Sequence, residues 1–239
     1  MQTRKQIGSL NVLEVTGASG GPAIIIFHGF GANASDLYPL HQHIKAPAGT
    51  NWFFAEGLLQ LAMLSDYSSR AWWPIDEAAL QYALNHGTFR DFASFAPPGL
   101  VAAREAAAGM IRALRDERGF ALDRITLGGF SQGAMLATDL TLRCHDLFDN
   151  QRPAGLAILS GTLLDEKVWS AFASDERFKG FQFFQSHGKS DPILDFVMAR
   201  RLEKILRDSG WTGEFVEFPG GHEIPPPVLA RLGQYLTRF

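Results

Sequence analysis

Residues 127–136 read LGGFSQGAML and place a serine, Ser131, between two glycines in the pattern Gly-x-Ser-x-Gly. The run before it, ITLGGF (125–130), is short and apolar like a buried strand, and the residues after it have the apolar spacing of a helix. A strand, a sharp turn and a helix together hold a serine hydroxyl out at the end of a sheet. Glycines and serines are also common in ordinary turns, so this segment alone leaves Ser131 as either a nucleophile or a spacer.

The serine segment belongs to a series of short apolar runs that alternate with helical patterns. The clearest helices are expected at 99–119 and at 192–210, the second with Pro192 in its first turn. Residues 9–17 alternate polar with apolar, which predicts an antiparallel edge strand. Strands in alternation with helices predict right-handed crossovers and an α/β fold, with a mainly parallel central sheet and helices on both faces. Buried strands are expected at 23–27, 52–55, 125–130, 154–160, 181–186 and 214–218.

The composition indicates a globular chain with a substantial core. The 239 residues are 46% hydrophobic, which argues against disorder, and their number suits a single α/β domain over 1–239. One stretch, 56–98, is rich in aromatics and lies between two core elements without a clear place in the sheet. We expect it to form an excursion over the sheet edge, near the substrate pocket.

Charge and cysteine content exclude several classes of function. The formal net charge is −3 and no cluster of Lys or Arg provides a surface for nucleic acid, so no nucleic-acid partner is expected. The first residues lack the apolar core of a signal peptide, and no apolar stretch reaches the roughly 18 residues of a membrane span. A cytoplasmic protein is therefore expected, while the oligomeric state stays open. The single cysteine, Cys144, excludes an intrachain disulfide and any multi-cysteine metal site.

Two polar residues beyond Ser131 suit the acid and the base that a serine nucleophile needs. Asp191 follows the expected strand at 181–186, and His222 follows the one at 214–218. This is the chain order of the serine, acid and histidine in enzymes with a strand–turn–helix nucleophile, and each residue lies just past the carboxyl end of a strand. The order therefore predicts Ser131 as nucleophile, Asp191 as acid and His222 as base.

Both partners also have simpler interpretations. Asp191 stands directly before Pro192 and can serve as a helix N-cap. Asp195 is a rival acid, although the pattern places it inside the helix, where it points less surely toward a histidine. His222 lies in a Gly-Gly-His turn and can be an ordinary loop residue.

The backbone around two turns suits an oxyanion hole. The N–H of Gln132, at the start of the helix after Ser131, faces the position where an oxyanion would develop. The second donor is expected from HGFGANASDL (28–37), after the strand at 23–27, with the N–H of Phe30 as candidate. The alternative is that His28 and Gly29 only form a tight turn.

Taken together, HGFGANASDL (28–37), LGGFSQGAML (127–136), HGKSDPILDF (187–196) and GGHEIP (220–225) resemble the small phospholipase/carboxylesterase family of α/β-hydrolases, to which the acyl-protein thioesterases belong. The resemblance runs from about residue 20 to the carboxyl end. It implies the α/β-hydrolase fold and chemistry without a metal or cofactor. It also implies the catalytic roles of Ser131, Asp191 and His222, with the amides of Phe30 and Gln132 as the oxyanion hole.

The resemblance extends less firmly to the substrate pocket. RAWWPID (70–76) resembles a Trp-Phe motif near the substrate in the family, which gives Trp73 a place in the pocket wall, with plain packing as the alternative. Leu58 and Leu61, in the leucine-rich run 57–64, are candidates for an apolar wall or for ordinary core. Ala134 stands where many family members have glycine, and Phe30 where leucine is frequent, and both differences can reshape the acyl site.

These observations lead to an expected function. The chain is expected to be a serine esterase that cleaves a small-molecule or lipid acyl ester through an acyl-enzyme, with lysophospholipids and acyl thioesters among the possible substrates. One alternative is an amidase or peptidase that uses the same three residues. Another is a noncatalytic protein of the same fold that binds a small ligand.

Overall fold

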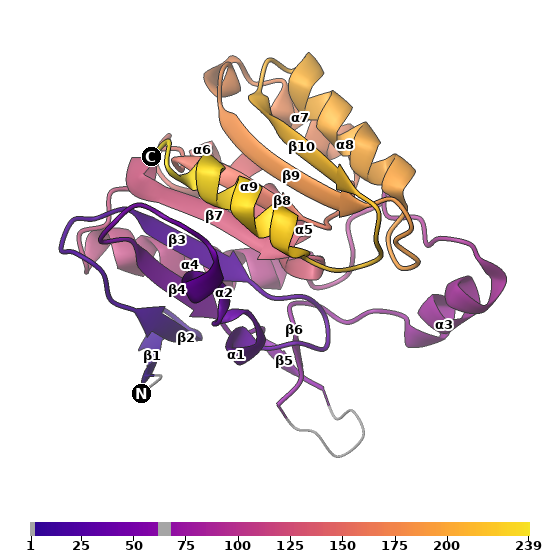
Figure 1. Ribbon diagram of the computed structural model, residues 1–239, viewed down its shortest axis with the longest axis horizontal. Coiled ribbons are helices and arrows are strands. Elements are labelled where there is room, and N and C mark those ends of the chain that lie inside the picture. Colours follow the sequence, from indigo (N-terminus) through magenta and orange to yellow (C-terminus); the bar gives the residue numbers. More distant parts are fainter. Residues whose placement is uncertain (1–2, 62–67) are drawn as a thin grey trace.

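The main element of the fold is an eight-stranded sheet with strand order β1-β2-β4-β3-β7-β8-β9-β10 (Figure 1). The structure, a computed structural model, describes residues 3–61 and 68–239. Strands β3, β4 and β7 to β10 run parallel to one another, and β1 and β2 pair antiparallel, so the mainly parallel sheet expected from the sequence is confirmed. The strands of this sheet are β1 Thr3–Ile7, β2 Leu10–Val15, β3 Ala23–Phe27, β4 Asn51–Ala55, β7 Ile125–Phe130, β8 Gly155–Leu159, β9 Gln182–Gly188 and β10 Thr212–Phe218.

Helices cover both faces of the sheet, also as expected. In β3, Ile25 and Phe27 belong to the same core cluster as residues of α4, α5, α7 and α8, whereas Ile24 and Ile26 belong to a second cluster that contains residues of α1 and α9. A strand covered on both faces needs apolar residues at every position, which is why the AIIIF run is continuous and does not alternate. Among the residues described, no helix is long and apolar enough to cross a bilayer. The α-helices are α1 Ala34–Leu37, α2 Leu40–His43, α3 Glu77–His86, α4 Leu100–Asp116, α5 Gln132–Leu142, α6 Cys144–Leu147, α7 Glu166–Ala173, α8 Phe196–Asp208 and α9 Pro226–Leu236, and short 3₁₀ turns lie at Leu122–Arg124 and Glu176–Phe178.

The expected edge strand at 9–17 is antiparallel but does not lie at the edge. Strand β2 pairs with β4 on one side and with β1 on the other, so β1 is the outermost strand. The chain reverses between β1 and β2 at Gly8, whose φ of 57° is favourable for glycine. This turn brings a short polar segment, TRKQI (3–7), to the exposed edge, where charged residues discourage pairing with another chain.

The helix expected over 192–210 begins later, at Phe196. One carboxylate oxygen of Asp191 accepts hydrogen bonds from the backbone N–H groups of Ile193 (2.8 Å) and Leu194 (3.0 Å), which holds the chain in a turn. Asp195 then caps α8 by accepting from Val197 N at 2.8 Å. Asp195 was expected inside the helix, and this expectation is wrong, because the turn at Asp191 delays the start of the helix.

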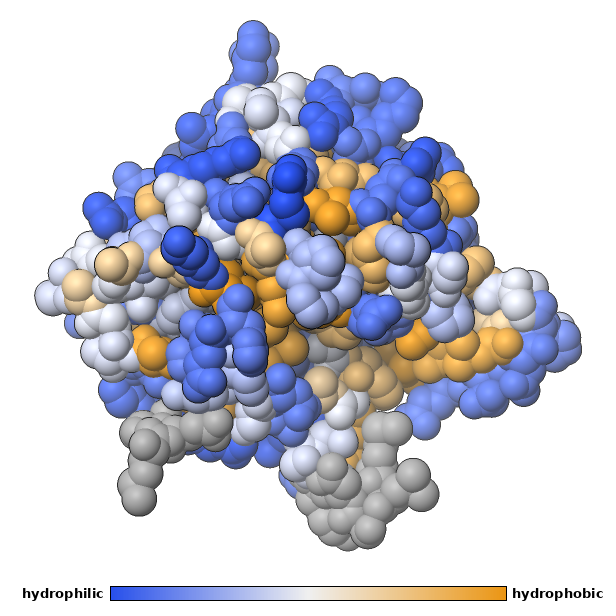
Figure 2. Space-filling view, in the orientation of Figure 1, coloured by the Kyte–Doolittle hydropathy of each residue, from blue (hydrophilic) through white to orange (hydrophobic). Residues whose placement is uncertain are grey.

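The chain between β4 and α4 leaves the main sheet. It forms a two-stranded sheet from β5 (Leu59–Gln60) and β6 (Arg70–Ala71), followed by α3, which lies apart from the sheet in Figure 1. Figure 2 shows apolar atoms on the arm that carries α3, where Leu84 and Phe89 are 39% and 44% exposed. Part of the leucine-rich run, residues 62–64, lies outside the described residues. The segment returns toward the sheet at 90–92, where it helps to line the cavity described below.

Candidate active site

Ser131 lies at the carboxyl end of β7, directly before the first residue of α5. Its backbone angles are φ 55° and ψ −118°, in a region that L-residues rarely adopt. Such a conformation costs about 1–3 kcal/mol and persists only where its surroundings enforce it. Here the backbone N–H of Ser131 donates to Leu159 O on β8 at 2.9 Å, which fixes the turn against the neighbouring strand.

The two glycines of the motif are required by close backbone approaches. A Cβ at Gly129 would lie 2.3 Å from the carbonyl carbon of Gly133, and a Cβ at Gly133 would lie 2.0 Å from Phe27 O. Neither gap admits a side chain, because the obstructing atoms belong to the backbone. The glycines therefore let α5 start directly against β7 and β3.

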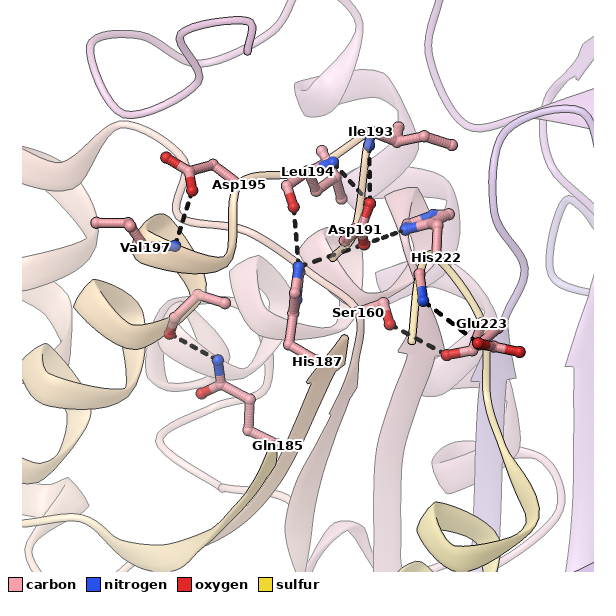
Figure 3. A network of polar contacts seen from close by, with 12 residues as sticks. Ser160, Gln185, His187, Asp191, Ile193, Leu194, Asp195, Val197, His222 and Glu223 are labelled. Carbon is pink, nitrogen blue, oxygen red and sulfur yellow. Dashed lines mark hydrogen bonds and ion pairs between the residues drawn. The ribbon is translucent and has the colours of Figure 1, made fainter. Parts of the chain in front are cut away.

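Asp191 and His222, which are 31 residues apart in the sequence, form a hydrogen bond in the structure. His222 Nδ1 lies 2.7 Å from Asp191 Oδ2 (Figure 3). Burial of Asp191 tends to raise its carboxyl pKa, but the hydrogen bond and charge of His222 and the two backbone donors outweigh it and hold that pKa below its usual value. The carboxylate is thus ionised and accepts from Nδ1–H, which leaves Nε2 of His222 as the basic nitrogen. The interpretation of Asp191 as a helix N-cap is wrong, because α8 begins at Phe196 after the cap Asp195. One oxygen of Asp191 instead holds the turn before that helix, and the other accepts from His222.

A second histidine contacts the same carboxylate. His187 Nε2 lies 3.3 Å from Asp191 Oδ2 and 3.0 Å from Leu194 O (Figure 3). Burial lowers the pKa of His187, so the ring is neutral and carries its proton on Nε2, toward these two oxygens. No local sequence pattern predicts this contact, because the approach of His187 to Asp191 depends on the turn at 191–194.

Ser131 and His222 line one cavity of about 180 Å³. Among the described residues, no hydrogen bond joins the Ser131 hydroxyl to His222, and catalytic hydrogen bonds of this kind are often long until substrate binds. The His222 ring packs against Phe130, with ring centroids 4.8 Å apart. No group of three or more metal-ligating side chains occurs within the described ranges. The cavity is lined by Gly29, Phe30, Ala32, Trp73, Ile75, Leu80, Arg90, Phe92, Phe130, Ser131, Gln132, Met135, Ile193, Leu194 and His222.

The pocket residues expected from the sequence divide into two groups. Trp73 lines the cavity and is 1% exposed, so it both packs and forms wall. Leu58 and Leu61 are not among the lining residues, and Leu58 is 38% exposed. Residues 59–61 pair with 69–71 in the small β5–β6 sheet, and the assignment of Leu58 and Leu61 to a wall of the substrate pocket stays a prediction. The apolar wall of this cavity includes Ile75, which belongs to the RAWWPID segment, and Phe92, which no sequence motif marked.

The two backbone N–H groups expected to bind an oxyanion, those of Phe30 and Gln132, belong to residues that line the cavity beside Ser131. Neither donates to a protein acceptor in the part of the chain that the structure describes. Gln132 is the first residue of α5, where backbone N–H groups lack a partner within the helix. Both donors are therefore free to bind an anionic oxygen at the serine.

The side chain of Gln132 fixes the position of the tryptophan pair. Its Oε1 accepts from Trp72 N and its Nε2 donates to Trp73 O, both at 2.9 Å. Trp72 Nε1 in turn donates to His28 O at 2.9 Å, which ties the loop of Phe30 to the same segment. The sequence analysis assigned Gln132 only a backbone role and assigned Trp72 no role. The two adjacent tryptophans were the one local feature that could have drawn attention to this contact.

His28 supports this loop as a neutral, buried ring. Gly57 N–H donates to His28 Nε2 at 2.9 Å, so the proton is on Nδ1, which lies 2.7 Å from Gly29 O. Burial lowers the pKa of His28 from 6.5 to about 4. The ring therefore holds the loop by one accepted and one donated hydrogen bond, and protonation would break the first.

The free energy of unfolding is expected to fall by about 2 kcal/mol between pH 7 and pH 5 through His28 alone. The unfolded chain takes up a proton on this residue near pH 6.5, whereas the folded chain does so only near pH 4. The contribution of neutral His28 to the free energy of unfolding is thus complete above pH 6.5 and is lost as the pH falls toward 4. Urea denaturation at both pH values measures it, and His28→Asn should reduce the pH dependence by this amount. An unchanged pH dependence in the variant would contradict the assignment.

A mainly parallel sheet with a strained serine between β7 and α5, and with an acid and a histidine after later strands, defines the α/β-hydrolase fold. The chain belongs to the phospholipase/carboxylesterase family, whose model matches residues 14–238. An acyl-protein thioesterase 1 from Neurospora crassa is 29% identical over 125 residues, which cover 51% of this chain and 48% of that protein. The match thus spans about half the length of this relative.

Solved structures of esterases share the fold. The crystal structure of esterase PE8 superposes with a TM-score of 0.76 at 20% identity and covers 95% of this chain and 97% of its own. A carboxylesterase from Mesorhizobium loti gives a TM-score of 0.73 at 20% identity, with 98% of both chains covered. At this level of identity the likeness establishes the fold, and function is argued from the site.

Proposed function

We propose that this protein is a serine hydrolase that cleaves carboxylic esters, with Ser131 as nucleophile, His222 as base and Asp191 as the acid that orients it. The observation that carries the proposal is the hydrogen bond of 2.7 Å between Asp191 and Nδ1 of His222, a residue that lines the same cavity as Ser131. A strained backbone at the serine and two free N–H groups beside it complete the requirements of acyl transfer. Membership of the phospholipase/carboxylesterase family favours esters over amides.

The reaction follows from the roles of these groups. Nε2 of His222 takes the proton of the Ser131 hydroxyl as the oxygen attacks the ester carbonyl. The N–H groups of Phe30 and Gln132 stabilise the oxyanion, and Asp191 stabilises the imidazolium. His222 then gives the proton to the departing alcohol, or to the departing thiol of a thioester, which leaves an acyl group on Ser131. Water, activated by the same histidine, hydrolyses this intermediate and restores the serine.

The cavity favours a small acyl group. Its volume of about 180 Å³ lies below the roughly 300–1,000 Å³ of pockets that enclose drug-sized ligands. Apolar side chains, including Trp73 and Met135, form much of its wall. Among ester substrates of equal reactivity, we therefore expect short acyl chains to react fastest, and a panel of 4-nitrophenyl esters of increasing chain length tests this.

Labelling with a fluorophosphonate probe tests the proposed function directly. The probe phosphonylates only an activated serine, so we expect modification at Ser131, located by mass spectrometry of the modified peptide. The His222→Ala variant should lose the labelling, because its serine has no base. A folded wild-type sample that does not react would contradict the proposal and would favour the noncatalytic ligand-binding alternative. Esters, thioesters and peptides compared on the same sample separate the esterase from the amidase or peptidase alternative.

A further inference from the structure

Arg90 is a cation in a cavity wall that is otherwise largely apolar. It borders the cavity of Ser131 and His222, and it also borders two adjoining hollows of about 600 and 190 Å³. Its guanidinium carbon lies 4.7 Å from the ring centroid of Phe92. The chain beside it is tied to the start of α7 by a hydrogen bond of 3.0 Å from Asp165 N to Phe92 O. The charge is therefore held beside the candidate active site by a packed aromatic ring and a fixed backbone.

Arg90 has no acceptor for its N–H groups within the described ranges. Its Nε is sealed from solvent and makes no hydrogen bond. Burial lowers the pKa of Arg90, and the charge of Asp76 opposes this without an ion pair within 4.0 Å. A guanidinium stays protonated in proteins and carries five donors, so a partly buried one without an acceptor is unfavourable in the absence of a ligand.

The acidic residues around Arg90 are engaged elsewhere. Three aspartates line the hollows that Arg90 borders, and each accepts a hydrogen bond from a backbone N–H two or three residues further along, at 2.8, 3.1 and 2.8 Å. These carboxylates stabilise turns and helix starts, and among the described residues none forms an ion pair with Arg90 within 4.0 Å. The aspartates are Asp76, Asp91 and Asp195.

We propose that Arg90 binds a carboxylate group of the substrate, so that the preferred esters carry a negative charge away from the scissile carbonyl. This proposal rests on the proposed ester hydrolysis at Ser131 and specifies its substrate class. A carboxylate matches the planar fork of a guanidinium and accepts two parallel hydrogen bonds from it. These hydrogen bonds are stronger in a partly dehydrated site than in water. The small cavity suits a short dicarboxylic monoester better than a bulky anionic headgroup.

The test compares two substrates that differ only in charge. One is the mono-4-nitrophenyl ester of glutaric acid, and the other is the matching glutaramate, in which a neutral amide replaces the carboxylate. Rates are measured above the enzyme-free hydrolysis at pH 7. A second pair, the butyrate esters of glycolic acid and of glycolamide, places the charge on the alcohol side and shows which half of the substrate Arg90 contacts.

The ratio of kcat/KM for the charged ester to that for its neutral partner is the quantity that reports on Arg90. In at least one pair, Arg90→Gln should lower this ratio by about 10- to 100-fold, the usual effect of losing a hydrogen-bonded charge pair. Arg90→Lys should recover part of it, because the charge returns without the fork. Arg124→Gln, at an exposed arginine in the 3₁₀ turn before β7, is the matched control and should leave the ratio unchanged. An equal loss on both substrates of each pair, in folded Arg90→Gln, would overturn the proposal.

Binding of glutarate itself separates this proposal from the proposed function. If no ester is turned over in a Ser131-dependent manner, the hydrolase assignment fails, yet calorimetry with glutarate still tests Arg90. We expect Arg90→Gln to weaken glutarate binding at least 10-fold relative to wild type. Absence of glutarate binding to the wild-type protein, or equal binding to the variant, would overturn the carboxylate site.

Discussion

Ser131→Ala is expected to lower kcat for a short 4-nitrophenyl ester by about five to six orders of magnitude while the protein stays folded. The hydroxyl oxygen is the atom that forms the acyl-enzyme, and no other group in the cavity can replace it in that step. Alanine keeps the Cβ at a backbone φ of 55°, so the strain of the turn is unchanged and the melting temperature should move little. Initial rates and thermal melting of the same preparation provide both readouts.

Ser160 provides the matched control for this variant. It also has a positive φ, 47°, and lies one residue past the end of the neighbouring strand β8, where its hydroxyl is 3.3 Å from Glu223 O. Ser160→Ala thus removes a hydroxyl from an equally unusual backbone position close to the loop of His222. We expect its rate to stay within about tenfold of wild type, since the group lost is one neutral hydrogen bond. Activity near wild type in Ser131→Ala would exclude the nucleophile assignment.

Asp191→Asn is expected to lower kcat by about 10⁴-fold, with a smaller effect on KM. The amide oxygen can still accept the two backbone hydrogen bonds of the turn at 193–194. The amide nitrogen would then face His222 Nδ1 as a donor, so the ring would have to carry its proton on Nε2. In that tautomer the histidine cannot take a proton from Ser131. The pH profile of kcat/KM for the variant and the wild type measures this effect. Raising the pH should not restore the activity of Asp191→Asn to the wild-type level.

Asp195→Asn is the control that distinguishes the orientation of His222 by an acid from the capping of α8. Within the described part of the chain, the Asp195 side chain accepts a hydrogen bond only from Val197 N, and asparagine is an equally good N-cap. This variant should therefore retain both its stability and a rate within about threefold of wild type. A loss of 10³-fold or more in Asp195→Asn, together with an active Asp191→Asn, would reverse the assignment of the acid.

The strands of the parallel sheet could be predicted because their burial leaves a local signal. A strand covered on both faces must be apolar at consecutive positions, so 23–27 and 125–130 were predicted with the bounds that β3 and β7 have. The polar strand β1 carries no such signal, since it lies at the edge of the sheet. The start of α8 was missed for a related reason, because a side-chain hydrogen bond of Asp191 decided it.

The candidate catalytic residues could be named for the same local reason. Parallel strands end at one edge of the sheet, so residues that follow β7, β9 and β10 are brought together wherever the strands pair. Asp191 and His222 do meet there. Arg90 and Phe92 could not be assigned in this way, because they lie on an excursion whose return to the sheet follows no periodic pattern.

The sequence by itself determined the parallel strands of the sheet, the strained serine turn and the chain order of Ser131, Asp191 and His222. These features depend on periods of apolar residues and on glycines, which act within a few positions of the chain. The tertiary structure alone decided that one carboxylate contacts both His187 and His222 and that Gln132 holds the tryptophan pair. It also decided that the buried Nε of Arg90 has no acceptor among the described residues. Each of these depends on residues far apart in sequence, and their distances are fixed only when the packed elements close around them.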